Sequence, residues 1–245
     1  MRMTRVHVEL PLAAGVEIEL PENAANHLAR VLRLGIGDTC VLFNGDGHDY
    51  PARLVEVGKR MVRVEVGPGI AIHNESSLRL VLLQGVARGE KMDLVLQKAA
   101  ELGVASLHPL YSQRSEVRLD GARADKRLAH WRGVVVSACE QCGRARVPGV
   151  AMPLPLAQTL EVLPKDGLRL ILDPDATASL SQLTLDPSQP VYLAVGPEGG
   201  WSPQDIEQLG AAGFNGVRLG PRVLRTETAG IAAIAALQVL HGDLG

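Results

Sequence analysis

Residues able to do chemistry gather in the last quarter of this chain, in two glycine-marked turns that join strands to helices. The first turn, Gly196-Pro197-Glu198-Gly199-Gly200, follows the apolar run Val191–Val195. The second, Gly220-Pro221, leads through Arg222–Arg225 into Thr226-Glu227-Thr228. Glycine permits positive φ and a close approach of the backbone to a ligand. Because open α/β sheets bind ligands at the carboxyl ends of their strands, both turns are predicted to border a binding site.

Each turn also has an interpretation that needs no ligand. The glycines of the first could serve a tight turn alone, and the pattern leaves both interpretations open. The first turn fits neither a dinucleotide fingerprint nor a P-loop, since it lacks G-x-G-x-x-G and Gly-Lys-Ser/Thr. At the second turn, Thr226 is expected to cap the last helix and Glu227 to favour its positive end, with functional roles added to these structural ones.

Composition and charge narrow the class of protein. The chain has 245 residues, 46% apolar and 21% charged, as expected for a soluble globular protein of one large or two modest domains. It has no apolar run long enough to span a membrane, its N-terminus lacks the apolar stretch of a signal peptide, and it has three cysteines. We therefore expect a cytoplasmic protein with reduced thiols.

The charge is unevenly distributed along the chain. Residues 1–150 contain 20 Lys+Arg and 17 Asp+Glu, whereas residues 151–245 contain 5 and 10. A basic N-terminal part suits a phosphate backbone, but scattered solvated charges explain so small an excess equally well.

The elements that must position these residues follow two patterns. Short strands and turns are predicted up to about residue 70, as in a small β-barrel, with a turn at Gly58-Lys59-Arg60 and a possible short helix over 26–34. Buried strands then alternate with helices, as in a parallel α/β sheet, and a proline-punctuated connection is expected over 148–164. The predicted strands are 78–83, 104–109, 168–172, 191–195 and 216–219; the predicted helices are 90–102, 122–142, one capped by Ser202 with Asp205 at the capping-box spacing, and 226–240.

The sequence gives little evidence for a metal site or for a catalytic nucleophile. Cys139 and Cys142 have C-x-x-C spacing, but no second cysteine pair or histidine cluster accompanies them, and both fall in a good helix pattern. The seven histidines are scattered and no Ser-His-Asp arrangement is visible. We expect no metal.

With these residues in view, the chain resembles the bacterial small-subunit ribosomal RNA uridine N3 methyltransferases of the SPOUT superfamily, nearly from end to end. Trp201 departs from the pattern, since a smaller or aliphatic residue is expected after the double glycine, and it is expected to trim the pocket without removing it. The resemblance is carried by His27-Leu28 with Val31-Leu32-Arg33, by Arg88–Met92, by Gln97-Lys98 with Glu101–Val104, by Glu140–Arg144, by Gly196–Gly200 and by Leu219–Thr228.

The resemblance implies an N-terminal PUA-like β-barrel over 1–72 that helps to bind RNA, and over 73–245 an α/β methyltransferase domain whose last segments form a deep trefoil knot. It also implies a homodimer and S-adenosylmethionine as cofactor. The implied cofactor-binding residues are Leu172, Val195, Gly196, Glu198, Gly199, Gly200, Leu219, Gly220, Leu224, Arg225 and Thr226.

The implied chemistry is methylation at N3 of a uridine, which must lose its proton to become a nucleophile. Arg225 is the candidate for balancing negative charge on the uracil oxygens, and Glu198 or Glu227 is the candidate base or proton relay. Candidate RNA contacts are Arg5, Arg33, Arg88, Lys91, Arg114, Arg144 and Arg222.

Two other functions compete with this one. A non-catalytic RNA-binding assembly factor would keep the fold, but both turns are intact here. A nucleotide-dependent oxidoreductase would need the dinucleotide fingerprint and an acidic ribose partner, which the sequence lacks.

Overall fold

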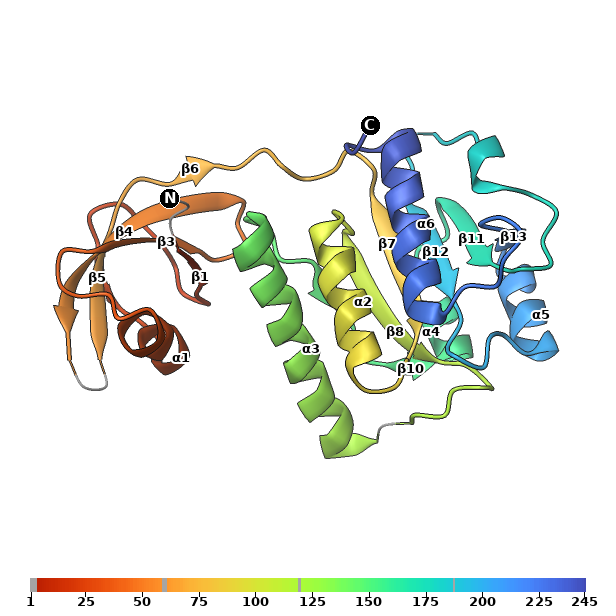
Figure 1. The fold of residues 1–245 in the computed structure, drawn as a ribbon, viewed down its shortest axis with the longest axis horizontal. Helices are drawn as coiled ribbons and strands as arrows, with labels where there is room; N and C mark the ends of the chain where they lie inside the picture. Colours follow the sequence, from red (N-terminus) through yellow and green to blue (C-terminus); the bar gives the residue numbers. More distant parts are fainter. Residues whose placement is uncertain (1–3, 59–60, 119, 187) are drawn as a thin grey trace. The chain divides into compact units, whose positions relative to one another are not determined.

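The computed structural model describes residues 4–58, 61–118, 120–186 and 188–245 (Figure 1). They fall into two compact units, residues 1–75 with 136–147 and residues 76–135 with 148–245. Lys59 and Arg60, part of the turn expected after Gly58, lie outside the described residues.

The first unit is built on a sheet of short strands. The strands follow the order β1-β3-β4-β5-β2, with β6 paired to β4, and among these pairs only β1 with β3 is parallel. Alternating residues such as Leu54, Val62 and Val64 are buried in its core, as the period-two pattern predicts. The elements are β1 Arg5–His7, β2 Glu17–Glu19, α1 Glu22–Asn26, the π-helical turn η1 His27–Val31, β3 Thr39–Phe43, β4 His48–Val57, β5 Val62–Val66 and β6 Ile70–Ala71.

The second unit has a sheet in which every described strand pair is parallel. Its order is β10-β8-β7-β12-β11-β13, with β9 beside β8. β7 Leu80–Gly85 and β12 Val191–Val195 lie at its centre and are buried along their whole length, which explains the apolar runs Leu80–Leu83 and Val191–Val195. The other strands are β8 Ser106–Tyr111, β9 Gly149–Val150, β10 Leu154–Pro155, β11 Leu168–Leu172 and β13 Asn215–Val217.

Helices cover both faces of this sheet. α2 (Glu90–Glu101) and α6 (Thr226–His241) lie side by side on one face (Figure 1). α4 (Leu156–Val162) and α5 (Pro203–Ala211) pack on the other, where Leu156 and Leu209 join Val81, Leu83 and Ala194 in a buried cluster. α3 (Gly121–Cys142) begins in the second unit, and its residues from 136 on group with the first. A short 3-10 turn, η2, spans Leu180–Gln182.

The start of α5 confirms its sequence signal. The Ser202 hydroxyl accepts from the Asp205 N–H at 3.0 Å, Asp205 Oδ2 accepts from the Ser202 N–H at 2.9 Å, and Pro203 begins the helix. This reciprocal capping satisfies two backbone donors that the helix leaves free, and it fixes the chain that follows the glycine turn.

Two sequence expectations were wrong. Residues 148–164 contain β9, β10 and α4 rather than only a connection; Pro155, with φ −54°, directly precedes α4, where proline is well tolerated. The short helix expected over 26–34 lies at 22–31 as α1 and η1. None of the helices in the described part of the chain is long and apolar enough to span a membrane.

Candidate functional site

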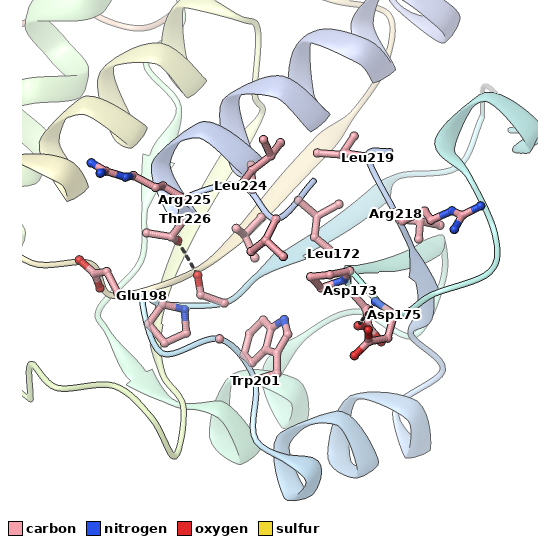
Figure 2. A pocket seen from close by; sticks show the side chains of 18 of the residues that line it. Leu172, Asp173, Asp175, Glu198, Trp201, Arg218, Leu219, Leu224, Arg225 and Thr226 are labelled. Carbon is pink, nitrogen blue, oxygen red and sulfur yellow. Dashed lines mark hydrogen bonds between the residues drawn. The ribbon is translucent and has the colours of Figure 1, made fainter. Parts of the chain in front are cut away.

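A cavity of about 510 Å³ opens at the carboxyl ends of β11, β12 and β13 (Figure 2). Its walls come from three strand-following segments, 172–175, 195–201 and 217–226, together with Lys91, Arg114, Ile206 and Ala229. Chain order reverses at the centre of this sheet, since β8 lies on one side of β7 and the later strands β12 and β11 lie on the other. Such a switch point at the carboxyl ends of parallel strands is where this architecture binds ligands.

The cavity brings together most residues that the sequence singled out. Arg225 and Glu198, expected to act in catalysis, both line it, whereas Glu227 and Gly199 are not among the lining residues. The remaining expected cofactor-binding residues all line the cavity: Leu172, Val195, Gly196, Gly200, Leu219, Gly220, Leu224 and Thr226.

The glycine turn after β12 is pressed against the end of β7. A Cβ on Gly85 would lie 2.5 Å from the Pro197 nitrogen, so only glycine lets the two segments meet. Gly200 has φ +65°, a conformation that side chains strongly disfavour. Gly85 therefore serves the close approach of the two segments and Gly200 the geometry of the turn. The turn itself lines the cavity.

A buried side chain that sequence reasoning missed ties this turn to α6. Gln84 is 1% exposed, and its Nε2 donates to Thr226 Oγ1 at 3.0 Å. The Thr226 hydroxyl in turn donates to the Gly196 carbonyl at 2.5 Å (Figure 2). Gln84 directly follows the apolar run Leu80–Leu83, and a lone glutamine at the end of such a run is the only signal that could have marked it. These two consecutive hydrogen bonds hold the glycine turn after β12 and the start of α6 in place relative to each other.

The expectation that Thr226 caps α6 was wrong. The capping position belongs to Arg225, which makes no side-chain capping bond, and Thr226 is the first helical residue. Its hydroxyl is taken by the Gly196 carbonyl and therefore cannot also cap the helix.

Glu198 links the glycine turn to the start of α2. Its Oε1 accepts from the Arg88 N–H at 3.0 Å and lies 3.3 Å from Lys91 Nζ. Burial raises the pKa of the Glu198 carboxyl, but these hydrogen bonds and the Lys91 charge outweigh it and leave that pKa below its ordinary value. Glu198 is therefore ionised at neutral pH and is a weak proton acceptor.

Arg225 and Glu227 lie on either side of Thr226 at the start of α6 but differ in surroundings. Arg225 is exposed, and Figure 2 shows it on the same side of the cavity as Glu198. Glu227 lies in the first turn of the helix, and its Oε2 is buried with no hydrogen-bond partner among the described residues. The helix N-terminus favours its negative charge.

Several cationic side chains line the cavity. Lys91, Arg114 and Arg222, expected as RNA contacts, line it, and Arg114 Nη1 donates to the Gly199 carbonyl at 3.1 Å. Arg88 lies outside the lining and pairs with Glu116. Arg218, which the sequence reasoning passed over, also lines the cavity, with its guanidinium pointing away (Figure 2).

The other expected RNA contacts belong to the first unit, and two of them are buried. Arg5 makes a bidentate pair with Asp49, with an Nη2–Oδ1 distance of 2.5 Å, and Arg144 makes one with Glu75, with an Nη2–Oε2 distance of 2.5 Å. Both guanidiniums therefore serve the fold. Arg33 is exposed, and its φ of +58° is the only positive value among the described non-glycine residues.

Further lining residues were missed because their signal is weak. Asp173 and Asp175 follow β11, and a polar pair directly after a buried strand could have marked them. Trp201 is 8% exposed, lines the cavity and belongs to the core cluster under α4 and α5, so it narrows the cavity but leaves it open. Among the described residues, no group of three or more His, Cys, Asp or Glu side chains could hold a metal ion.

Comparison with known families assigns both parts of the chain. Residues 74–238 match the model of the RNA methyltransferase domain, and residues 20–67 match that of the RNA methyltransferase PUA domain. The first match contains every lining residue of the cavity.

Individual relatives agree over nearly the whole length. The ribosomal RNA small subunit methyltransferase E of Buchnera aphidicola from Schizaphis graminum is 31% identical over 99% of this chain and 98% of its own length. That of Bacillus subtilis is 27% identical over 89% and 90%. The crystal structure of the Neisseria gonorrhoeae protein of the same name, bound to S-adenosyl methionine, is 41% identical, superposes with a TM-score of 0.95 and covers all of both chains.

Proposed function

Because the chain belongs to the ribosomal RNA small subunit methyltransferase E family of RNA methyltransferases, we propose that it transfers the methyl group of S-adenosylmethionine to N3 of a specific uridine in small-subunit ribosomal RNA. The observation that carries the proposal is the cavity at the ends of β11, β12 and β13. Apolar residues such as Leu172, Val195 and Leu224 suit an adenosine, and the cations that line the cavity suit RNA.

Charge management is the main catalytic task in this proposal. The sulfonium of the cofactor already activates the methyl group, so the protein must orient the two reactants and stabilise the uracil anion. Arg225, exposed at the cavity and next to the positive end of α6, is assigned to the charge on the uracil oxygens. The target base must be unstacked to reach it.

Glu198 is assigned the proton-relay role in preference to Glu227, because only Glu198 lines the cavity. Its lowered pKa makes it a weak base. Most of the rate enhancement is therefore assigned to stabilisation of the anion by Arg225, and less to proton abstraction.

The RNA contacts in this proposal are Arg88 and the cations that line the cavity, Lys91, Arg114 and Arg222. Arg33 of the first unit is proposed as a separate contact. Arg5 and Arg144 are left out because their guanidiniums are buried in ion pairs. Residues 1–72 are proposed to form a PUA-like β-barrel, which the first unit's sheet and the PUA match support.

The proposal also includes a deep trefoil knot within residues 73–245, a homodimer and a cytoplasmic location. The knot would involve the three cavity segments. The dimer is supported by apolar residues exposed at the end of the chain: Val239 (55%), Leu240 (47%) and Leu244 (50%). Light scattering on the purified protein tests the dimer.

The deciding experiment maps ribosomal RNA by mass spectrometry in a strain that lacks this protein. We expect one uridine of the small-subunit RNA to lack a methyl group, and expression of the wild-type chain to restore it at N3. Assays on naked RNA and on assembled subunits then identify the substrate. An unchanged methylation pattern in the deletion strain would refute the proposal.

A further inference from the structure

Asp173 is held rigidly at the edge of the cavity, across from Glu198 (Figure 2). It directly follows β11, and its N–H donates to the Val217 carbonyl at 3.0 Å, which fixes it to β13. Its Oδ1 accepts from the Asp175 N–H at 3.0 Å. The side chain is therefore positioned by its neighbours before any ligand binds.

The carboxylates at the two ends of the cavity differ in availability. Glu198 is already engaged by Lys91 and by the Arg88 N–H. In contrast, Oδ2 of Asp173 makes no hydrogen bond within the described structure, and a Cβ on Gly216 would lie 3.8 Å from it, in ordinary contact. A free carboxylate oxygen at a cavity wall is an acceptor for a ligand hydroxyl or amine.

The proposed reaction determines which part of the cofactor reaches Asp173. If methyl transfer takes place beside Arg225 and Glu198, the sulfonium lies at that end of the cavity. The ribose is attached to the sulfur through one carbon, so the ribose and adenine extend toward Asp173. The apolar wall formed by Leu172, Val195 and Trp201 is then available to the adenine ring.

We propose that Asp173 accepts hydrogen bonds from the ribose hydroxyls of S-adenosylmethionine and thereby fixes which end of the cofactor faces Arg225. This inference rests on the proposed function and adds a specificity-determining residue to it. The vicinal 2′- and 3′-hydroxyls present two donors to one carboxylate. Acidic residues hold the ribose of dinucleotides by the same chemistry at the same edge of other α/β sheets.

Trp201 independently supports a polar ligand group at this end. The side chain lines the cavity, and its Nε1 is buried without a partner among the described residues. Figure 2 shows the nitrogen-bearing edge of the ring turned toward Leu172 and Asp173. Trp131 also has an unpartnered Nε1, but it is 1% exposed and does not line the cavity, so its placement gives no such indication.

The test measures binding of three adenosine compounds to the full chain by calorimetry: S-adenosylhomocysteine, methylthioadenosine, which lacks the amino acid, and the 2′,3′-dideoxy analogue of methylthioadenosine. Asp173→Asn keeps an oxygen for the Asp175 N–H and so preserves the turn. We expect it to weaken the first two compounds about tenfold each and to leave the dideoxy compound unchanged. Glu207→Gln, which removes an exposed charge from α5 outside the cavity, is the matched control and should change none of them.

Other results overturn the inference. Weaker binding of S-adenosylhomocysteine alone would mean that Asp173 meets the α-ammonium group. An equal loss for all three compounds would assign Asp173 to adenine or to cavity shape, and no loss for any would remove its role. If wild type binds none of the three, the proposed function itself fails; if wild type binds and the variant binds equally well, only the assignment of Asp173 fails.

Discussion

The arginines of the two units are used in opposite ways. In the first unit, the side chains of Arg5 and Arg144 are 6% and 5% exposed and each makes a bidentate pair with a carboxylate. In the second unit, Arg222 and Arg225 are exposed and line the cavity. A guanidinium that already holds a buried carboxylate stabilises the fold, whereas one at an open cavity can bind an incoming anion. Burial separates these two uses, and residue type does not.

Breaking a buried pair gives the largest expected effect. Arg144→Ala leaves the Glu75 carboxylate, whose side chain is 30% exposed, without its partner. We expect a loss of about 3 kcal/mol in the free energy of unfolding, at the low end for buried pairs because Glu75 reaches solvent. Urea unfolding followed by circular dichroism measures it.

The matched control for Arg144 is Arg53→Ala, since Arg53 is exposed on β4. Its stability should stay within about 0.5 kcal/mol of wild type. Equal stability losses in the two variants would contradict the distinction between buried and exposed arginines.

Removing an exposed arginine at the cavity should lower activity and leave stability unchanged. Arg225→Ala is expected to lower methyl transfer about a hundredfold, as for loss of a donor that stabilises a developing anion. Its unfolding midpoint should match wild type because the side chain is exposed and makes no capping bond. A methyl-transfer assay checks the first point, and urea unfolding followed by circular dichroism checks the second. Normal cofactor binding by calorimetry together with full methyl transfer would end the proposal for Arg225.

The same contrast explains how far the sequence predicts the structure. β12 was predicted to the residue because a fully buried strand is a continuous apolar run, and β11 because four of its five residues are apolar. The capping box at Ser202 is a local signal. The partners of Arg5 and Arg144 are 44 and 69 residues away in sequence, so no local pattern shows them.

The candidate site likewise contains residues that the local sequence predicts and residues that only distant contacts place. Its glycine turns were visible in the sequence because glycine reports backbone geometry directly. Thr226 was misread as a cap because its true partners, Gly196 and Gln84, are 30 and 142 residues away. Asp173 was missed because only the fold places the end of β11 at the same cavity as the end of β12.

Gln84 tests whether a buried neutral side chain can position an open site. Gln84→Met keeps the volume but removes the donor to Thr226, and we expect cofactor binding to weaken about tenfold. Gln84→Glu should weaken it further, because an ionised carboxylate only accepts and competes with the Gly196 carbonyl for the Thr226 hydroxyl. Calorimetry measures both variants, with Gln97→Met, exposed on α2, as control. If Gln84→Met binds the cofactor as wild type does, the hydrogen bonds from Gln84 through Thr226 to Gly196 have no role in positioning the site.

The smallest expected effect is a shift in pH dependence. The Glu198 pKa lies below its ordinary value, so the contact with Lys91 is present at neutral pH and is lost as pH falls through that lowered pKa. Lys91→Met removes the cation, and the pKa of Glu198 should rise. The acid limb of kcat/KM should therefore move to higher pH if Glu198 must be ionised. Lys98→Met removes a lysine of the same helix that pairs with Glu101 and should leave the limb in place. If the acid limb does not move in Lys91→Met, Glu198 is not the titrating group. Arg225 would then be the only one of these two residues with a role in catalysis.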